Sequence, residues 1–404
     1  MVPLCLAGHA CQSADCRLRG QRTAVRVGFR FGPCVSVTCG PKRNVNPGVS
    51  IEDNDMLKGL NLVDFARKIE ANRELKRDMI ANSRDLVMTV DDDRVVKMNI
   101  GGGEGAYPIL HHAHDQIGAR LGIPSKYYDR MLGESPQLLV NNTNHWFSKS
   151  QERRMIRTLG GDMRAYLSDR YNRIENEEIA EVALPILGDI PDVQFVSTEV
   201  TDKRMYIQAV APRIQGEVKL NDIVQAGVVI SNSEIGMGSV SVAPMIWRLR
   251  CLNGMVVPDS KFRAYHVGKR VEDSEQLWAD DTRKADDRAI LLKVRDVVRA
   301  AVDAARFHEK IEQMRGLTTA HVTGSPERAV EVLAQKVGVT DTERSGLLRS
   351  LIEGGDLSAW GLLNAVTAQA HTARDYDRAV EFETAGGQLL TMSKSEWKEV
   401  LTAE

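Results

Sequence analysis

A run of β-rich segments between residues 193 and 257 constrains this chain more than any other feature of its sequence. VQFVSTEVTDKRMYIQAV predicts a hairpin that turns at Thr201 to Arg204, and IVQAGVVISNSE predicts a third strand. GMGSVSVAPMIWRLRCLNGMVV begins with a glycine turn, continues as a fourth strand and ends at an Asn253-Gly254 turn. Strands joined by short turns pair antiparallel. We therefore expect an α+β fold built on a twisted antiparallel β-sheet that helices flank.

Alternation along the fourth strand assigns its side chains to two faces of the sheet. One face would carry Val240, Val242, Ile246, Arg248 and Arg250, and the other Met245, Trp247, Leu249 and Cys251. We expect Trp247 in the core rather than on a base-stacking surface. Arg248 and Arg250 are expected at the wetter end of the sheet.

Helical patterns surround this sheet. The stretch RAYLSDRYNRIENEEIA at 164–180 predicts a strand followed by a helix with Asn176 as its N-cap. From Asp286 to Ile311, apolar residues recur at alternating spacings of four and three, which predicts one long helix with a heptad seam. That seam could pack on the protein's own core or against another subunit. Ser325-Pro326 predicts a helix start, and Thr340 with Glu343 a capping box.

These patterns divide the chain into four expected parts. Residues 1–55 form a disordered leader, or precede a true start at Met56: they hold five of the six cysteines without a C-x-x-C spacing, and their first 50 positions carry seven basic residues and one acid. Residues 56–150 form a helical region with a small hairpin. Residues 151–316 form the α+β core, which ends in the long helix, and 317–404 form a small helical C-terminal domain.

Charge and hydropathy limit the classes of function. The formal net charge is -2, so a nucleic-acid partner would have to meet a local basic patch. No apolar run approaches the roughly 20 residues of a membrane span, and a cytoplasmic location is expected. GGGEG at 101–105 lacks the G-K-[ST] of a phosphate-binding loop, and no cofactor is expected.

Two basic stretches suggest a nucleic-acid surface. Alternation in 164–170 places Arg164, Tyr166 and Arg170 on one strand face. The segment SKFRAYHVGKR at 260–270 interleaves basic residues with aromatics, and no acid lies between Asp259 and Glu272. Charges that follow a backbone and rings that stack on bases suit single-stranded nucleic acid. A solvated turn into the next helix explains the second stretch equally well.

Two alternatives use the segment HHAHDQIGARLGIPSKYYDRML at 111–132. It fits a helix-turn-helix template with Gly122 in the turn, in which Ser125 to Leu132 would be a recognition helix for duplex DNA. The same segment holds His111, His114 and Asp115, which could serve a metal-dependent enzyme. It lacks the Glu of an H-E-x-x-H motif, and solvated or capping histidines are the simpler interpretation.

Several motifs, in order, resemble the phage- and plasmid-borne family called domain of unknown function 932. They are HDQIGARLGIPSKYYDRML, NTNHWF, RAYLSDRYNRIENEEI, RLRCLNGMV, GLLNAVTAQA and YDRAVEFETAGGQLLTMSKSEW, and the resemblance covers about residues 56–404. It implies a mobile-element protein with no agreed catalytic residues. The order of elements is also similar to that of single-strand annealing recombinases, in which a basic groove holds single-stranded DNA and subunits form rings.

The resulting hypothesis is a nucleic-acid-binding protein, with annealing of single-stranded DNA in recombination or replication as its expected role and a homo-oligomer as its expected state. It needs no catalytic residue and no metal. Its expected binding residues are Arg164, Tyr166, Arg170, Arg173, Lys203, Arg204, Arg248, Arg250, Lys261, Arg263, His266, Lys269 and Arg270.

Overall fold

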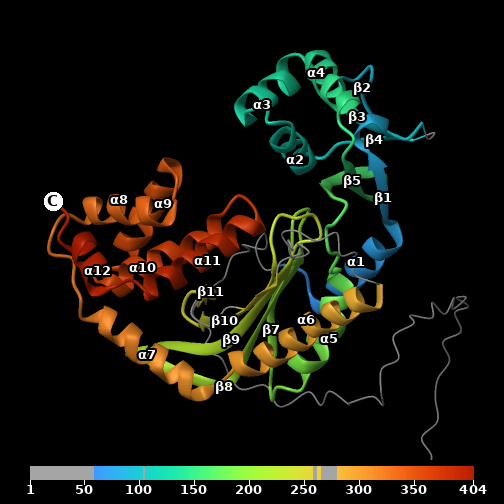
Figure 1. The fold of residues 1–404 in the computed structure, drawn as a ribbon. Coiled ribbons are helices and arrows are strands. Elements are labelled where there is room, and N and C mark those ends of the chain that lie inside the picture. The colour runs from blue at the N-terminus through green and yellow to red at the C-terminus, as the bar shows by residue number, and fades with distance from the viewer. Residues whose placement is uncertain (1–58, 103–104, 258–261, 265–279) are drawn as a thin grey trace, which may run out of the picture. The chain divides into compact units, whose positions relative to one another are not determined.

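The computed structural model in Figure 1 describes residues 59–102, 105–257, 262–264 and 280–404. Contacts divide the chain into residues 1–52 and 53–404, and the description below concerns the second unit. Helices and antiparallel sheets make up this unit, which confirms the α+β class. The expectations for residues 1–55 lie outside the described ranges. Within those ranges, no helix combines the length and the apolar character needed to cross a membrane.

The main sheet has the strand order β11-β10-β9-β8-β7, with β12 pairing on β10, and all its pairs are antiparallel. The hairpin turn at Thr201 to Arg204 is confirmed by a hydrogen bond from Thr201 N to Arg204 O of 2.8 Å. The strands are β7 (Gln194–Val200), β8 (Met205–Lys219), β9 (Asp222–Asn232), β10 (Val240–Arg248), β11 (Asn253–Val256) and β12 (Phe262–Ala264).

The predicted turn at Asn253-Gly254 is wrong. The turn occupies residues 249–252, where Leu252 takes a φ of 50°, and Asn253 and Gly254 begin β11. Gly254 serves close packing instead, because a Cβ there would lie 2.9 Å from the sulfur of Met245 and 3.0 Å from the carboxylate of Glu383. Trp247 packs partly buried against a small cluster on its own face of the sheet, as expected.

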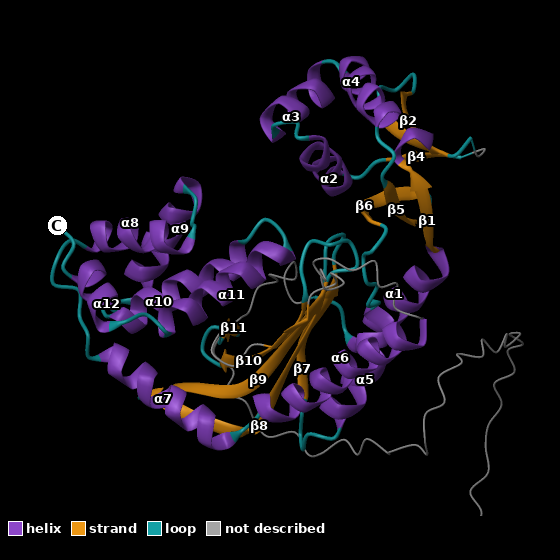
Figure 2. Ribbon diagram, viewed as in Figure 1, coloured by secondary structure: helices purple, strands orange, loops and turns teal. Residues whose placement is uncertain are grey.

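One face of the long strands serves two hydrophobic cores. Val228 and Ile230 pack into a core with α1, α5 and α6, whereas Val224 and Ala226 pack into a core with α7 and the C-terminal helices. Figure 2 shows α5 and α6 lying beside the strands of the main sheet. The first core's helices are α1 (Leu62–Leu75), α5 (Asn176–Gly188) and α6 (Asp280–Ala301).

The single long helix predicted for 286–311 is two helices. α6 ends at Ala301, and α7 (Ala304–Thr318) begins after Asp303, whose side chain accepts the N–H of Arg306 at 2.9 Å. The break lets each half serve a different core: Val294 of α6 packs into the first and Ile311 of α7 into the second. The seam of α6 and Ile311 of α7 therefore face the protein's own core, whereas the seam positions Ala304 and His308 are exposed.

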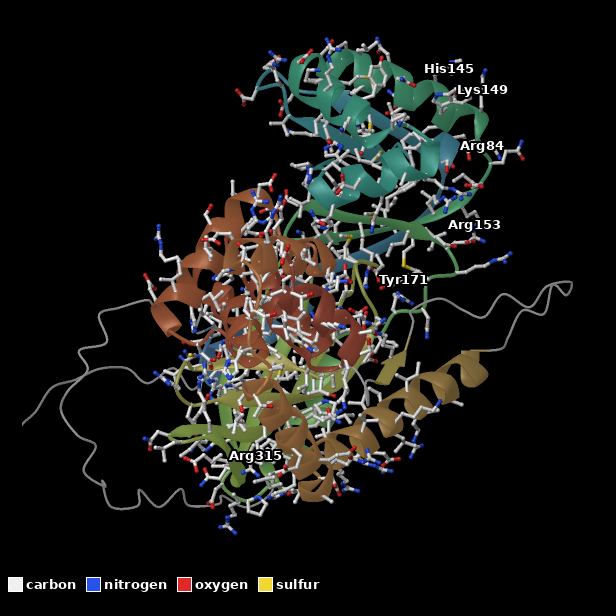
Figure 3. All side chains as sticks on the ribbon, turned by 90° about the vertical axis from the view of Figure 1, so that its left-hand side faces the viewer. Arg84, His145, Lys149, Arg153, Tyr171 and Arg315 are labelled. Atoms are coloured by element: carbon white, nitrogen blue, oxygen red, sulfur yellow. The ribbon has the colours of Figure 1, made fainter. Side chains whose placement is uncertain are left out.

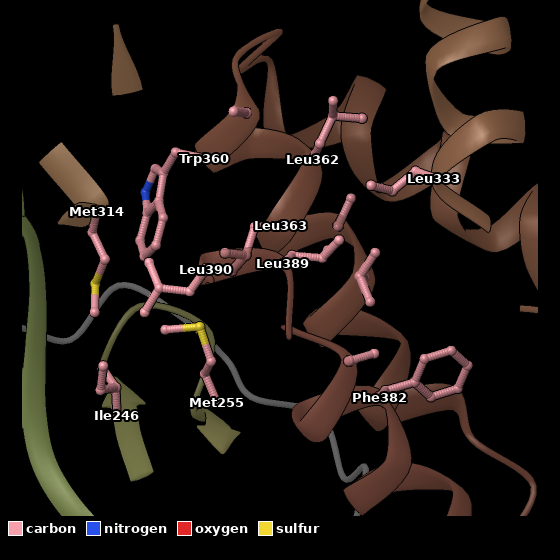
Figure 4. Packing of buried hydrophobic residues seen from close by; sticks show 14 of the residues in the cluster. Ile246, Met255, Met314, Leu333, Trp360, Leu362, Leu363, Phe382, Leu389 and Leu390 are labelled. Carbon is pink, nitrogen blue, oxygen red and sulfur yellow. The ribbon is translucent and has the colours of Figure 1, made fainter. Parts of the chain in front are cut away.

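The C-terminal helices close the second core over one end of the sheet. Figure 4 shows Trp360 among Met314, Ile246, Met255 and Leu390, which come from different elements. The predicted helix start at Ser325 and the capping box of Thr340 and Glu343 are confirmed. The helices are α8 (Pro326–Val337), α9 (Asp341–Gly354), α10 (Ala359–Ala368), the 3₁₀ turn η4 (Gln369–Thr372), α11 (Tyr376–Leu390) and α12 (Lys394–Leu401).

Residues 76–168 form a third core between two small antiparallel sheets and three helices. One sheet has the order β1-β5-β6, and the other, β2-β3-β4, contains the expected hairpin around Asp91. The elements are β1 (Lys76–Asn82), the 3₁₀ turn η2 (Ser83–Asp85), β2 (Leu86–Val90), β3 (Val96–Ile100), β4 (Ala106–Pro108), α2 (His111–Leu121), α3 (Ser125–Glu134), α4 (Pro136–Lys149), β5 (Arg153–Leu159) and β6 (Asp162–Ser168).

Candidate nucleic-acid interface

A β-bulge decides where Arg164 points. β5 and β6 pair Arg157 with Ala165 and Thr158 with Met163, so Arg164 is an extra residue without a partner across the ladder. A bulge breaks the alternation of faces. The predicted exposed face is therefore wrong for Arg164, which is only 6% exposed. It is also wrong for Tyr166, which is buried and whose hydroxyl lies 3.3 Å from Ser83 Oγ.

Arg164 belongs to a buried ion pair instead. Its Nη1 donates to Glu234 Oε2 at 2.7 Å. Glu234 Oε1 accepts the backbone N–H of Asn176 at 2.8 Å and also bonds the ammonium of Lys76. Burial opposes the ionised carboxyl, but the positive charges of Lys76 and Arg164 outweigh it and lower the pKa of Glu234 to about 2.

The same network surrounds Lys76 with carboxylates. Its Nζ lies 2.7 Å from Glu177 and 3.1 Å from Glu175, and it also bonds Glu234. In the described ranges, these three glutamates are the one set of His, Cys, Asp or Glu side chains spaced to share a metal ion. Because Lys76, Arg157 and Arg164 together supply three positive charges to these three carboxylates, the cluster has a sufficient structural explanation.

Arg157 joins this network to β1. Its Nε donates to Asp78 at 2.8 Å and its Nη1 to the backbone oxygen of Glu234 at 2.6 Å. Arg173, which remains exposed, bonds the other oxygen of Asp78 at 3.1 Å. Glu175, rather than the predicted Asn176, is the N-cap of α5, in a capping box with Glu178. The charges are thus arranged to fix the start of α5 against the small sheet.

The structure does not bring the three predicted metal ligands together. His111 is exposed, and its Nε2 lies 3.8 Å from Asp115 Oδ2. His114 is buried on another side of α2, where its Nδ1 lies 2.9 Å from the hydroxyl of Tyr128. Burial lowers the pKa of His114 to about 4, so it is neutral at pH 7.

α2 and α3 are joined by a short turn at Gly122, where the helix-turn-helix template places its turn glycine. Gly122 ends α2 with a φ of 68°, and α3 begins three residues later at Ser125. Gly118 lets the helices approach, because a Cβ there would lie 2.9 Å from the Tyr128 ring. Lys126 and Tyr127 are exposed on α3. Recognition of duplex DNA by this helix stays a prediction.

The remaining predicted residues are dispersed. Arg248 is buried, because Asp222 accepts hydrogen bonds from its Nε and Nη2 at 2.6 and 2.7 Å, so its expected position at the wet end of the sheet is wrong. Arg204 is half-buried and donates to Met237 O. Lys203 is half-buried, and Arg170, Arg250 and Arg263 are exposed. Lys261, His266, Lys269 and Arg270 lie outside the described residues.

A basic surface with an exposed indole lies elsewhere, at the end of α4. Trp146 is 48% exposed, the Nζ of Lys149 lies 5.9 Å from its ring centroid, and the ring of His145 lies 5.3 Å away, edge-on. The resembling motif NTNHWF contains two of these residues. The sequence hypothesis did not include this surface, although the histidine and tryptophan four and three residues before Lys149 could have indicated it.

Two arginines from other elements extend this surface. Arg84 lies in η2, which packs against α4, and the backbone N–H of Ser83 bonds Glu152 O at 2.9 Å, next to Arg153. Figure 3 shows His145, Lys149, Arg84 and Arg153 projecting from the same side of this region. We call Arg84, His145, Trp146, Lys149 and Arg153 the Trp146 patch.

The cations of the Trp146 patch are not neutralised by neighbouring acids. Among the residues the structure describes, no carboxylate forms an ion pair with Arg84, Lys149 or Arg153. The nearby Glu152 is paired with Arg120 and Arg154, whose hydrogen bonds outweigh desolvation and lower its pKa to about 2. The patch therefore presents net positive charge on a protein of formal net charge -2.

Comparison with known proteins gives one match. Residues 165–394 match the family described as Domain of unknown function (DUF932). No curated protein and no solved structure matches the chain.

Proposed function

The chain belongs to the family described as domain of unknown function 932, whose description assigns no activity, and we propose that it binds single-stranded nucleic acid. The expected ligand is single-stranded DNA rather than RNA, and the binding surface is the Trp146 patch. The observation that carries this proposal is the half-exposed indole of Trp146 beside unpaired cations. An aromatic ring supplies a stacking face for any base, and the cations follow the phosphates. Annealing of complementary strands is the role this chemistry would serve, because recognition is left to base pairing.

The exposed indole of Trp146 favours single-stranded over double-stranded nucleic acid as the ligand. In a duplex, neighbouring base pairs cover the faces of each base. An exposed indole could therefore stack on a base only if two neighbouring base pairs were first separated. Unstacked bases of a single strand are available directly. The duplex alternative rests on the exposed Lys126 and Tyr127 of α3, where Asp129, Arg130 and the paired Glu134 leave little net charge.

The test is an anisotropy titration of a labelled single-stranded oligonucleotide and its duplex, at several salt concentrations, with the full chain. Trp146→Ala should weaken single-strand binding by roughly 1 to 3 kcal/mol without changing the log-log salt slope, and Trp146→Phe should retain most of the affinity. Equal thermal midpoints of the variants would show that the fold is intact.

Two results would contradict the proposal. One is the absence of salt-dependent affinity for single strands at low salt. The other is a duplex preference that Lys126→Ala abolishes and Trp146→Ala leaves unchanged, which would assign binding to α3.

A further inference from the structure

A second cationic site lies where the ends of β8 and β10 meet the C-terminal helices. It is a cavity of about 110 Å³. About 10–15 Å³ of such space holds one water molecule, so this volume accommodates a tetrahedral oxyanion. Its lining includes Lys219, Arg248, Arg250, Cys251 and Asp356.

The charges around this cavity do not cancel. Lys219 Nζ is paired with Asp356 Oδ2, and Arg248 is paired through two bonds with Asp222. Arg250 is exposed and forms no ion pair with any residue the structure describes. Two compensated cations and one uncompensated cation give the cavity a net positive charge, which favours an anion.

Arg248 is held in place before any ligand arrives. Trp360 Nε1 donates to Asp222 Oδ2 at 2.9 Å, and the Arg248 guanidinium lies 5.6 Å from the Trp360 ring centroid. Arg248 Nη1 then points at Cys251 Sγ, 3.0 Å away. Sulfur is a weak acceptor, so this N–H is poorly satisfied and would gain from an anionic oxygen.

Small residues and neutral polar side chains also line the cavity. Gly354, Gly361 and Ala365 leave the space open, and Ser350 and Asn364 carry side chains that can hydrogen-bond an oxygen. A Cβ at Gly361 would lie only 1.7 Å from Asp356 O, so that glycine is required by the close approach of the chain. A lining that combines cations with neutral donors matches an anion with several oxygens.

We propose that this cavity binds a phosphate group, with Arg250 as its main electrostatic partner and Arg248 and Lys219 as flanking donors. Guanidinium groups bind phosphate oxygens by paired hydrogen bonds, and the net positive charge that Arg250 leaves at the cavity favours a phosphate over a neutral ligand. The phosphate can come from a free nucleotide or from the 5′ end of a strand. The inference does not depend on the function proposed for the Trp146 patch.

The test uses the full chain with inorganic phosphate, adenosine monophosphate, and a short oligonucleotide with either a 5′-phosphate or a 5′-hydroxyl, at constant ionic strength set with chloride. Isothermal titration gives the affinity. Alkylation of Cys251, followed by peptide mass spectrometry, locates the binding, because an anion in the cavity should protect that thiol. Local protection also separates binding from the general stabilisation that phosphate gives to folded proteins.

Arg250→Ala should weaken phosphate binding about tenfold or more and abolish the protection of Cys251. The matched control is Arg213→Ala, which removes an exposed arginine paired with Asp192 on another part of the surface and should change neither readout. Tighter binding of the 5′-phosphate strand than of adenosine monophosphate would identify a strand end as the source of the bound phosphate group. Tighter binding of adenosine monophosphate would identify a free nucleotide.

The proposal is overturned if phosphate fails to protect Cys251, or if Arg250→Ala binds phosphate as well as the wild-type protein does. Because Arg250 is exposed, its replacement should leave the thermal midpoint unchanged.

Discussion

Arg164 Nη1 lies 2.7 Å from Glu234 Oε2, and both side chains are less than a tenth exposed. The pair joins β6 of the small sheet to the segment that follows β9 of the main sheet. Lys76 and the backbone of Asn176 share the other oxygen of Glu234, so one carboxylate holds β1, β6 and the start of α5 together. Arg164, which resembles part of a binding surface in the sequence, thus belongs to the interior.

Removing the carboxylate should be strongly destabilising. Glu234→Leu leaves Arg164 and Lys76 buried with fewer partners, and loss of one side of a buried pair costs about 3 to 5 kcal/mol. Urea denaturation followed by circular dichroism measures the free energy of unfolding. Arg213→Ala, which breaks an exposed pair with Asp192, is the control and should cost less than about 1 kcal/mol. Similar losses in both variants would contradict a structural role for Glu234.

The Glu234 pair should also give the protein an acid-sensitive stability. The folded-state pKa of Glu234 is about 2, below the ordinary 4.5. A depressed carboxyl pKa stabilises the fold fully above pH 4.5, and that contribution is lost as the pH falls towards 2. Urea midpoints measured across this window should fall steeply for the wild-type protein and less steeply for Glu234→Gln. Parallel curves would assign the acid sensitivity to other carboxyls.

Gly118 should be essential to the packing of α2 on α3. An alanine there would place its Cβ 2.9 Å from the Tyr128 ring, so Gly118→Ala should destabilise the fold by about 1 to 3 kcal/mol. Gly133→Ala is the matched control, because a Cβ at that helical position meets nothing within 4 Å. It should be neutral or stabilise by up to about 1 kcal/mol. Thermal and urea unfolding of both variants measure the difference.

The sequence predicted the parts of the fold that local patterns determine. Alternation and turn spacing identified the hairpin at Thr201 to Arg204, and side-chain capping identified the helix starts after Ser325 and Thr340. The break after α6 also had a local signal, because Asp303 is a good N-cap, but the heptad spacing continues across it. Two competing local signals were present, and the cap determined the outcome.

The candidate site depends on distant contacts that no local pattern contains. Arg248 is buried because Asp222, 26 residues earlier, reaches it across the ladder of β9 and β10. The bulge at Arg164 follows from the pairing of β5 with β6, not from the residues of β6 alone. The Trp146 patch likewise requires η2 and β5 to meet the end of α4. This contact brings Arg84 beside a motif that begins 58 residues later in the chain.

The seam of α6 should prove to be internal. Val294 is fully buried in a core with the main sheet, so Val294→Asp would place a charge among apolar side chains and should unfold the protein. Leu292, two residues away, is 43% exposed, and Leu292→Asp should change stability by less than about 0.5 kcal/mol. Size-exclusion chromatography with circular dichroism separates the outcomes: a folded but smaller species for Val294→Asp would instead indicate a subunit contact.

The arginines of the Trp146 patch should contribute to single-strand binding through charge alone. Arg84→Ala with Arg153→Ala removes two phosphate partners, so the log-log salt slope should fall in magnitude by about 0.7 for each arginine removed, whereas Trp146→Ala lowers affinity at constant slope. Both arginines are exposed and unpaired within the described ranges, so the thermal midpoint should not change.

The matched control for this pair is Lys293→Ala with Arg299→Ala on the exposed side of α6, which removes the same charge elsewhere. Salt titrations of the wild-type protein, the patch variant and the control variant against one single-stranded oligonucleotide show whether a weaker affinity comes from lost local contacts or from a lower overall charge. If the control lowers the slope as much as the patch variant, binding follows the overall charge of the protein. A lowered slope in the patch variant alone assigns the phosphate-binding role to Arg84 and Arg153, because only a local interaction distinguishes two substitutions of equal charge.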